Sequence, residues 1–371
     1  MMEIKIDRGQ FSRCLGKIQG IVERKNTMPI LANCVIKAGK GNVEIQATDL
    51  DITIKDKCSA EVKKTGMVSL NAKKLYEILR ELDEGEMIVK EVDPNKLEIK
   101  SSNFTYELQG INPEEFPVLP TTEGFQFFEI ETEVLLEMVK KTIYATALEE
   151  GRFTLNGIFM ERFKDKGILR FTATDGHRMA MIDREVKGFE ELKLEKGVIL
   201  PKKGMSELEK LSAGFEGKIQ LGIKDNHIAL QIGETLMFMR LIDGEFPEYQ
   251  RVIPENNPIK VTVKRDSFLK GLRRASVMVD EKARSVKLSF KDGKMEIEGR
   301  HPSYGVAKGE SECEFTGKAF EIGFNDRYLF DILNAVNASQ VYMEFKDELS
   351  PVLFKFDDDN KYIGVIMPMR F

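Results

Sequence analysis

The chain has 371 residues, of which 42% are hydrophobic and 32% charged, as expected for a soluble globular protein of two or three domains. No apolar run reaches the length of a transmembrane helix, and Met1–Asp7 is typical of a strand rather than a signal peptide, so we expect a cytoplasmic protein. The four cysteines, Cys14, Cys34, Cys58 and Cys313, form no CxxC pair and are expected to be buried free thiols rather than disulfides or zinc ligands.

A strand preceded by glycine occurs three times, and successive copies are 126 residues apart. The copies are Gly41–Ala47, Gly167–Ala173 and Gly293–Gly299. In each of them apolar residues occupy the same two alternating positions, as in a half-buried strand, and the glycine favours a turn before the strand. The sequence therefore predicts three copies of one structural unit.

Each copy is predicted to begin with a strand followed by an amphipathic helix. The strands are Ile4–Ile6, Phe128–Ile130 and Val261–Val263. The helices place two apolar residues four positions apart on one face: Phe11 and Leu15, Leu135 and Val139, and Phe268 and Leu272. We expect Thr132 and Asp266 to act as N-caps, because their side-chain oxygens can accept hydrogen bonds from the first free helix amides.

A second helix follows the recurring strand in every copy, and further strands complete the unit. The apolar faces of these helices are Leu75, Ile78 and Leu79, then Met205, Leu208 and Leu211, then Leu329, Ile332 and Leu333. Hairpin turns are predicted at Asp225–Asn226 and Asp358–Asn360. Each unit ends at a Phe-Pro or Met-Pro pair, namely Phe116–Pro117, Phe246–Pro247 and Met367–Pro368.

These elements predict an α+β fold of three repeated antiparallel-sheet domains with two helices each. Linkers that contain proline, Pro117–Gly124 and Pro254–Pro258, separate the copies. We therefore expect domains at residues 1–122, 126–253 and 259–371.

Positive charge is concentrated in the six predicted helices, which span residues 8–25, 71–82, 131–148, 201–213, 264–279 and 325–337. They contain 19 basic and 11 acidic residues, a net charge of +8, whereas the whole chain carries −5 and the remainder therefore −13. If the helices share one surface, that surface attracts phosphate. No helix-turn-helix, zinc-finger or aromatic RNA-binding pattern is present, so contact with the nucleic-acid backbone, independent of base sequence, is favoured. The alternative is that the lysines of each helix simply face solvent.

The segment Thr174–Arg178 occurs in full only in the second copy. It contains His177, which could act as a base, and Asp175, which could orient it. No nucleophile motif accompanies this pair, and the three histidines of the chain lack the spacing of metal ligands. The first copy has Asp49 at the position of Asp175, so both aspartates are interpreted as turn residues. A pocket for a partner is therefore favoured over a hydrolase site, and we expect no metal and no cofactor.

The C-terminal segment Val365–Phe371 is apolar up to its last residues. It could be a last core strand, but Pro368 cannot donate to a strand ladder and leaves Met369 and Phe371 beyond the strand. Methionines at a surface suit adaptable peptide binding.

Several motifs, in this order and at these spacings, resemble those of the β subunit of bacterial DNA polymerase III, the sliding clamp family. They are Met28–Leu31, Ala47–Leu50, Ala173–Met179, Asp243–Tyr249 with Val252–Pro254, Ile322–Asn325 and Met367–Phe371. The resemblance extends over the whole chain. It implies the DNA clamp fold, in which two chains of three domains form a head-to-tail, six-domain ring with the helices around a central hole.

The resemblance also implies a function without catalysis. The ring would encircle double-stranded DNA regardless of its sequence and tether the replicative polymerase, which gives processivity in DNA replication. The implied partners are a second copy of the chain, the α subunit of DNA polymerase III, the clamp loader, and other polymerases and repair proteins, with no membrane. The alternative is a scaffold that binds proteins but not DNA, and the charge of the helices argues against it.

The family's site residues can be carried over to matching positions. The implied peptide-binding groove between the second and third copies comprises Leu155, Thr174, Gly176, His177, Arg178, Met179, Pro247, Val252, Asn325, Tyr328, Val365, Met367, Pro368, Met369 and Arg370. The implied DNA contacts are Lys25, Phe153, Lys202 and Lys203, where Phe153 and Thr154 replace the paired tyrosines of some members. The implied dimer interface places Tyr106 and Leu108 against Val277 and Met278.

Overall fold

The computed structural model describes residues 1–22, 28–39, 41–101, 104–147, 151–188, 194 and 196–370. The chain divides into two compact bodies. The N-terminal body comprises Met1–Thr132, Gly188–Lys193 and Lys203–Leu241, and the C-terminal body comprises Glu133–Lys187, Leu194–Lys202 and Ile242–Phe371. Within the described ranges, no helix combines the length and the apolar character needed to cross a membrane.

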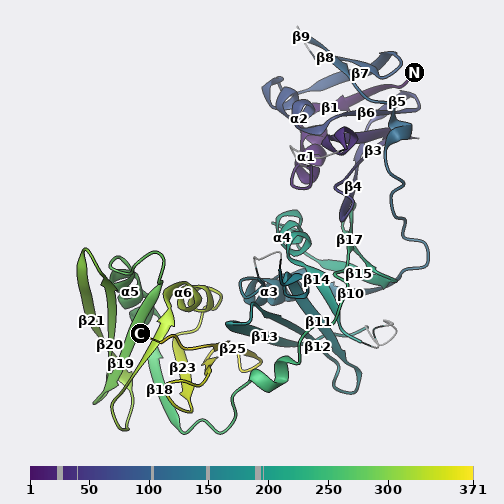
Figure 1. Cartoon of the computed structure of the whole chain (residues 1–371). Helices are drawn as coiled ribbons and strands as arrows, with labels where there is room; N and C mark the ends of the chain where they lie inside the picture. Colours follow the sequence, from purple (N-terminus) through teal and green to yellow (C-terminus); the bar gives the residue numbers. More distant parts are fainter. Residues whose placement is uncertain are drawn as a thin grey trace. The chain divides into compact units, whose positions relative to one another are not determined.

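The N-terminal body contains two antiparallel sheets (Figure 1). The first has the order β5 (Glu61–Lys64), β1 (Glu3–Asp7), β7 (Glu86–Asp93), β8 (Lys96–Ser101) and β9 (Phe104–Gln109). The second has the order β10 (Gln126–Glu131), β15 (Lys218–Lys224), β16 (His227–Ile232), β17 (Thr235–Arg240), β4 (Ile52–Ser59), β3 (Asn42–Thr48), β2 (Asn33–Ala38) and β6 (Gly66–Asn71). Helix α1 (Arg8–Ile18) packs on β4 and beside α2 (Ala72–Glu81).

The C-terminal body is built around one antiparallel sheet of twelve strands. Their order is β14 (Val198–Pro201), β11 (Gly157–Phe163), β12 (Ile168–Thr174), β13 (Arg178–Glu185), β25 (Tyr362–Ile366), β24 (Val352–Phe356), β23 (Gln340–Phe345), β18 (Ile259–Lys264), β21 (Gly305–Glu314), β20 (Lys294–His301), β19 (Ser285–Lys291) and β22 (Phe320–Asn325). The helices of this body are α3 (Thr132–Ile143), α5 (Arg265–Ser276) and α6 (Asp326–Asn334), with short 3₁₀ helices at Phe153–Leu155, Lys164–Lys166 and Tyr249–Val252. Helix α4 (Lys202–Leu211), apart from Lys202, and the 3₁₀ helices Pro29–Ala32 and Pro113–Glu115 belong to the N-terminal body.

The recurring strands form as predicted and become β3, β12 and β20. The glycine before each strand has a positive φ, 77° at Gly41, 63° at Gly167 and 75° at Gly293. This left-handed conformation is open to glycine at little steric cost, which explains why the same residue recurs at this point of the turn. The predicted second helices also form, as α2, α4 and α6, and both predicted hairpin turns connect neighbouring strands.

The two predicted N-caps are wrong. Thr132 is the first residue of α3, and its hydroxyl donates to the Gly217 carbonyl instead of accepting from the helix. Asp266 lies inside the first turn of α5 and pairs with Arg265 at 3.0 Å. Side-chain caps occur instead where a strand runs directly into a helix, at Asp7, Asn71 and Asn325. The cap position therefore depends on the end of the preceding strand, which the apolar spacing did not locate.

The first predicted helix is also too long, since α1 ends at Ile18 and not at residue 25. Gly16 lies in the last turn of α1 and Gly20 just beyond its end, and glycine is among the poorest helix formers. The six helices described carry 16 basic and 9 acidic residues, a net +7 in a chain of −5, so the predicted concentration of positive charge in the helices is confirmed.

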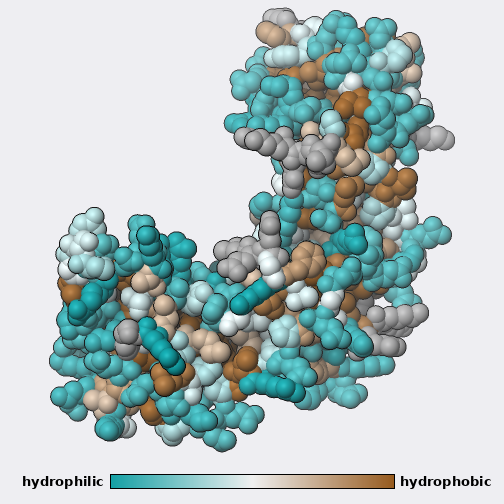
Figure 2. Space-filling view, in the orientation of Figure 1, coloured by the Kyte–Doolittle hydropathy of each residue, from teal (hydrophilic) through white to brown (hydrophobic). Residues whose placement is uncertain are grey.

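Apolar residues fill the space between each sheet and its helices, and Cys14, Cys34 and Cys58 are buried free thiols as predicted. Cys313 is free but only half-buried. Figure 2 shows mainly hydrophilic side chains on the visible surface, interrupted by small apolar areas, as is usual for a globular protein.

Strand pairing joins successive copies of the unit within each body. In the first junction, β17 of the second copy pairs with β4 of the first, with Met237 opposite Ile54. In the second junction, β25 of the third copy pairs with β13 of the second, with Gly364 opposite Ala180. Thus the closing strand of one copy extends the sheet of the copy before it.

Two further strands, β9 and β21, keep an unpaired side in the described part of the chain. Strand β9 closes the first copy and pairs only with β8. Strand β21 pairs with β20 along its length but with β18 only through Glu314 and Cys313. Residues 305–312 of β21 and the outer side of β9 therefore present free backbone groups that could pair with another strand.

Candidate functional site

The turn Thr174–Arg178 is fixed by hydrogen bonds between its own residues. The Thr174 hydroxyl donates to the Arg178 carbonyl at 2.6 Å and accepts from the Gly176 amide at 3.1 Å. The Asp175 carboxylate accepts from the amides of His177 at 2.9 Å and Arg178 at 3.0 Å. Gly176 has φ +89°, a conformation that favours glycine. Asp175 is thus a turn residue, as predicted.

The first copy contains the same turn. The Thr48 hydroxyl donates to the Ile52 carbonyl at 3.0 Å and accepts from the Leu50 amide at 3.0 Å. Asp49 accepts from the amides of Asp51 at 3.0 Å and Ile52 at 2.7 Å. The agreement of all four bonds confirms that the two aspartates are equivalent parts of the repeated fold.

This geometry does not support the hydrolase alternative. One oxygen of Asp175 serves the turn amides and the other accepts from the Arg178 guanidinium at 3.0 Å, so the carboxylate is occupied by structural bonds. The His177 side chain is exposed. A catalytic pair would need the carboxylate to orient the imidazole, and the hydrogen bond between the two residues is made by the His177 backbone instead.

Arg178 connects three parts of the C-terminal body. Its guanidinium donates to Asp175 at 3.0 Å, to Asp331 of α6 at 2.5 Å and to the Tyr144 carbonyl after α3. The rings of Tyr144 and Tyr328 lie 5.3 Å and 4.4 Å from the guanidinium carbon. Because the side chain is nearly buried and each of its three nitrogens donates a hydrogen bond, Arg178 holds the turn against α3 and α6.

Sequence reasoning missed Asp331 and Tyr144, although both are bonded to Arg178. Asp331 lies 153 positions from Arg178, and an acidic residue inside a helix is usually solvated. One available signal was the helix register, because Asp331 precedes Ile332 just as Glu207 precedes Leu208 in the preceding copy.

Next to this turn lies an apolar cluster of Met179, Tyr249, Leu353 and Val365, with Phe246 and Ile253 packed against it. Tyr249 donates to Glu161 and accepts from Arg170 at 3.2 Å, which anchors the segment before Val252. Val252 and Met367 are exposed at its edge. A cleft of about 550 Å³ continues from this edge, lined by residues 250–256 with Lys346, Ser350 and Pro351.

The C-terminal residues complete this surface. The Met367 amide donates to the His177 carbonyl at 2.9 Å, and the Met369 amide donates to the Gly323 carbonyl at 2.8 Å. Strand β25 ends at Ile366, so Met369 lies beyond it, as Pro368 predicts. Phe371 lies outside the described residues.

All fifteen implied groove residues belong to the C-terminal body. The buried members are Leu155, Thr174, Met179 and Val365; the half-buried members are Arg178, Asn325, Tyr328, Pro368 and Met369; the exposed members are Gly176, His177, Pro247, Val252, Met367 and Arg370. The arrangement combines an apolar floor with an exposed edge that contains His177 and Met367. Such a surface can bind short apolar segments of another protein.

The second junction contains a cluster of four charges. Lys141 of α3 pairs with Glu137 at 2.8 Å and Asp359 at 2.7 Å, and Arg184 of β13 pairs with the same two carboxylates. Burial opposes ionisation of both acids, but the hydrogen bonds from Arg184 and Lys141 outweigh it and lower the pKa of Glu137 and of Asp359. The cluster therefore joins α3 to the hairpin before β25.

The first junction contains a smaller polar group at the corresponding place. Lys17 of α1 pairs with Asp56 of β4 at 3.0 Å and donates to the Thr235 hydroxyl of β17 at 2.8 Å. Thr235 in turn donates to Asp56 at 3.1 Å. In both junctions a lysine of the first helix therefore contacts the incoming strand or its hairpin.

The implied DNA contacts are distributed over both bodies. Lys25 lies outside the described residues, and Phe153 is exposed on a 3₁₀ turn. Lys202 is half-buried, and burial together with the nearby Arg178 charge lowers its pKa. Lys203 pairs with Asp49 at 2.6 Å, which neutralises part of its charge.

The implied dimer residues lie on the two edge regions. Tyr106 and Leu108 are half-buried on β9, whereas Val277 is 81% exposed and Met278 half-buried after α5. Exposed apolar side chains beside a free strand edge are typical of an interaction surface.

No group of three His, Cys, Asp or Glu residues in the described ranges could hold a metal ion.

Models of the DNA polymerase III beta subunit match almost the entire chain: its N-terminal domain at residues 2–120, its central domain at 129–248 and its C-terminal domain at 250–370. Beta sliding clamps of Caulobacter vibrioides and Pseudomonas aeruginosa are 33% and 30% identical to the chain, with 100% of both chains covered in each case.

Solved structures of sliding clamps are also similar to this chain. The DNA polymerase sliding clamp of Caulobacter crescentus matches with a TM-score of 0.94, 32% identity and full coverage of both chains. A sliding clamp from Bartonella birtlesii, the DNA polymerase III subunit beta bound to griselimycin, matches with a TM-score of 0.94, 34% identity and full coverage of both chains. With every domain matched in order, the resemblance seen in the sequence is confirmed, and the chain belongs to the DNA polymerase III beta subunit family, the sliding clamps.

Proposed function

We propose that two copies of the chain form a head-to-tail ring that encircles duplex DNA and tethers the replicative polymerase. Sliding clamps are processivity factors and not enzymes. The observation that carries the proposal is the pattern of strand pairing. Two of three equivalent junctions close within the chain. In the described residues the strands of the third keep an unpaired side, because β9 lies at a sheet edge and β21 pairs with β18 only through Glu314 and Cys313. A second copy can supply each missing partner, which makes a closed ring of two chains.

We divide each chain into domains at residues 1–122, 126–253 and 259–371, so the ring has six domains. The family matches at 2–120, 129–248 and 250–370 support this division. The net charge of +7 on the helices supports a lining that attracts phosphates of any sequence, with Phe153, Lys202 and Lys203 as contacts. Because a closed ring is held by topology, the DNA contacts can stay weak.

Retention on closed and open DNA tests this proposal. The clamp, loaded onto nicked circular DNA, should remain bound through gel filtration and be lost after a single restriction cut. Equal retention on circular and linear DNA would contradict the topological mechanism. Failure to bind either DNA, with partner peptides still bound, would favour a protein scaffold instead. Light scattering at micromolar concentration should give a mass of two chains.

We further propose that the fifteen groove residues bind short apolar segments of the polymerase α subunit, the clamp loader and other polymerases and repair proteins. The buried cluster under the exposed Val252 and Met367 supports an anchor-in-pocket mode of binding. One peptide should bind weakly, and attachment to the ring raises its effective concentration.

The groove is tested with a double variant, His177→Ala with Met367→Ala. Affinity for a polymerase C-terminal peptide should fall about tenfold or more in fluorescence anisotropy. Asp51→Ala is the matched control, because Asp51 occupies the position of His177 in the first-copy turn and is also exposed. Unchanged affinity in the double variant, or an equal loss in the control, would place the groove elsewhere.

A further inference from the structure

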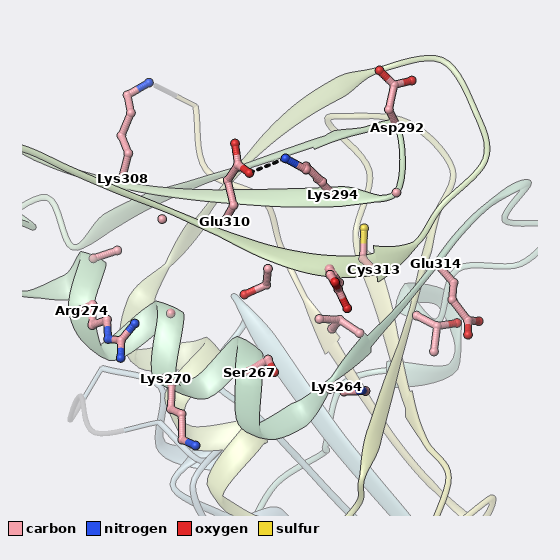
Figure 3. Close-up of a pocket in the computed structure, with 18 of the residues that line it drawn as sticks. Lys264, Ser267, Lys270, Arg274, Asp292, Lys294, Lys308, Glu310, Cys313 and Glu314 are labelled. Atoms are coloured by element: carbon pink, nitrogen blue, oxygen red, sulfur yellow. Dashed lines mark hydrogen bonds and ion pairs between the residues drawn. The ribbon is translucent and has the colours of Figure 1, made fainter.

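Two clefts of the C-terminal body lie where the proposed function requires a partner. The larger, about 930 Å³, lies between α5 and residues 307–314 of β21, and Lys270, Arg274 and Glu310 are among the charged side chains that line it (Figure 3). It follows the strand edge that the second copy covers in the proposed ring. The smaller cleft, about 550 Å³, is lined mainly by residues 250–256 and continues the proposed peptide groove. The contacts that fix this segment therefore matter for peptide binding.

Residues 247–253 connect the second copy to the third and include two members of the proposed groove, Pro247 and Val252. We call this segment the groove strap. It forms a 3₁₀ turn, in which two of its amides donate to carbonyls within the strap at 3.3 Å. Among the described residues, no hydrogen bond between backbone groups joins the strap to the strands of the sheet. The strap is therefore held by its side chains.

The Tyr249 side chain connects the groove strap to three neighbouring strands. It is 2% exposed, its hydroxyl donates to the Glu161 carboxylate, and the same hydroxyl accepts from the Arg170 guanidinium at 3.2 Å. Glu161 of β11 lies opposite Arg170 of β12, which in turn lies opposite Asp183 of β13. We call these three strand residues, Glu161, Arg170 and Asp183, the polar row. The phenol thus bonds to two members of a row that crosses the sheet.

Asp183 fixes the direction of the Arg170 guanidinium. Its two carboxylate oxygens accept from Nε of Arg170 at 2.6 Å and from Nη2 at 2.8 Å, and the centre of the Phe163 ring lies 4.7 Å from the guanidinium carbon. The hydrogen bonds with Asp183 raise the pKa of Arg170, so the guanidinium stays charged. A bidentate pair restricts the guanidinium plane, and Nη1 is then directed at the phenol. Asp183 therefore acts on Tyr249 through Arg170.

The aromatic contacts of Tyr249 are less directional than its hydrogen bonds. Phe159 and Phe246 stack with ring centres 4.7 Å apart, and the Tyr249 ring meets them edge-on at 6.4 Å and 6.3 Å. Apolar packing favours any buried position of the ring, whereas a hydrogen bond weakens steeply when its angle changes. Burial also raises the pKa of Tyr249, so the phenol remains a donor to Glu161 at neutral pH. The two hydrogen bonds therefore define where the strap lies.

The corresponding segment of the N-terminal body, residues 117–124, is held differently. The Lys55 ammonium donates to the Pro120 carbonyl at 2.6 Å, and the Lys224 ammonium donates to the Glu123 carbonyl at 3.0 Å. Both of these bonds fix the backbone of the segment directly. In the groove strap the hydroxyl of one side chain makes the polar contacts with the sheet, so the loss of that hydroxyl should loosen the strap.

We infer that the polar row positions the groove strap through the Tyr249 phenol and so sets the affinity of the groove for apolar peptides. This inference rests on the proposed peptide groove and names the residues that hold one of its walls. Val252 and Met367 are both exposed at the edge of the groove, so a peptide contacts both only when the strap keeps its place. A wall that is fixed before binding also lowers the entropy lost when the peptide binds.

Removal of the phenol hydroxyl tests the inference in the full chain. Tyr249→Phe keeps the ring and should weaken binding of the polymerase C-terminal peptide about fivefold in fluorescence anisotropy, because both hydrogen bonds are lost. Arg170→Met should have a similar effect. The double variant should bind about as tightly as Arg170→Met alone, since both changes break the same connection. Tyr342→Phe is the matched control, because the Tyr342 hydroxyl has no hydrogen-bond partner in the described ranges.

Trypsin cleavage after Arg251 measures the strap without any peptide. The Arg251 side chain is 81% exposed, but cleavage requires the strap to open locally, so the cleavage rate reports how firmly the strap is held. We expect Tyr249→Phe and Arg170→Met to raise this rate about fivefold, measured by mass spectrometry of the fragments, with little change at other sites. A general loss of stability would accelerate cleavage at all sites alike, which distinguishes positioning of the strap from a structural role elsewhere.

Three results would overturn the inference. Unchanged peptide affinity in Tyr249→Phe would show that the phenol does not position the groove, even if trypsin cuts the strap faster. Additive losses of affinity in the double variant would show that Arg170 acts by another route. Equal acceleration at all trypsin sites would assign the loss of affinity to lower stability of the whole chain. By contrast, a wild-type chain that binds no peptide would contradict the proposed groove itself.

Discussion

The first and second junctions have the same turn conformation but differ in the side chains of that turn. Both begin with a Thr-Asp turn in which the third residue, Leu50 or Gly176, has a positive φ of 81° or 89°. At the fifth position the first junction has the buried Ile52, and the second has Arg178, which reaches Asp331 and Tyr144. A repeated scaffold can thus form a closed apolar contact in one copy and a charged support beside a binding surface in another.

The polar groups of the two junctions also differ in redundancy. The buried Asp56 of the first junction, 1% exposed, pairs with a single cation within the described residues, Lys17, whereas Glu137 and Asp359 of the second share Lys141 and Arg184. A buried carboxylate that loses its only cation keeps its desolvation cost without compensation. Loss of one cation should therefore be more harmful in the first junction, although its polar group is smaller.

Replacement of the lysines gives the largest expected difference. Lys17→Met should lower the free energy of unfolding by about 3 kcal/mol, at the lower end for a broken buried pair because Lys17 is 38% exposed. Lys141→Met, of the same shape and charge change, should cost only about 1 kcal/mol, since Arg184 still pairs with both acids. Urea unfolding of both variants measures the difference. Equal losses would show that the shared cations do not compensate for each other.

Replacement of Arg178 separates the function of the second junction from its stability. Arg178→Met leaves Asp331 and the Tyr144 carbonyl without a donor, and we expect a loss of about 2 kcal/mol together with about tenfold weaker peptide binding. Ile52→Val is the matched change in the first junction, where about 1 kcal/mol of stability and no peptide affinity should be lost. Calorimetry and anisotropy provide the two readouts. If Arg178→Met binds peptide normally, the guanidinium does not position the groove.

The recurring strands and second helices could be predicted because local patterns determine them. Alternating apolar residues and a glycine with positive φ suffice to define β3, β12 and β20, whatever lies around them. The support for Arg178 could not be predicted in this way, because Asp331 lies in α6 and Tyr144 just after α3, both distant from Arg178 in the sequence. The N-caps failed for a related reason, since the strand end that places Asp7 or Asn325 is set by pairing with another strand.

Acid should weaken the second junction through its carboxylates. Glu137 and Asp359 have a lowered pKa in the folded chain, so their contribution to stability is complete above their usual pKa of about 4 and is lost as the pH falls through the folded values. Between pH 5 and pH 3 we expect a loss of about 1 kcal/mol from this cluster, discounted because Glu137 is partly exposed. Glu137→Gln should flatten this part of the curve, whereas the exposed Glu129→Gln should not. A slope that Glu137→Gln leaves unaltered would assign the acid sensitivity to other groups.

The smallest effect concerns the third residue of the shared turn. Leu50 holds the left-handed conformation with a side chain that is 55% exposed, so little burial compensates for its backbone strain. Leu50→Gly should therefore raise the free energy of unfolding by about 0.5–1 kcal/mol, and the reverse change, Gly176→Ala, should lower it by about 1 kcal/mol. Thermal unfolding detects both shifts. If Leu50→Gly destabilises the chain, then Leu50 makes an apolar contact worth more than the strain, and the two turns are equivalent in hydrogen bonding but not in energy.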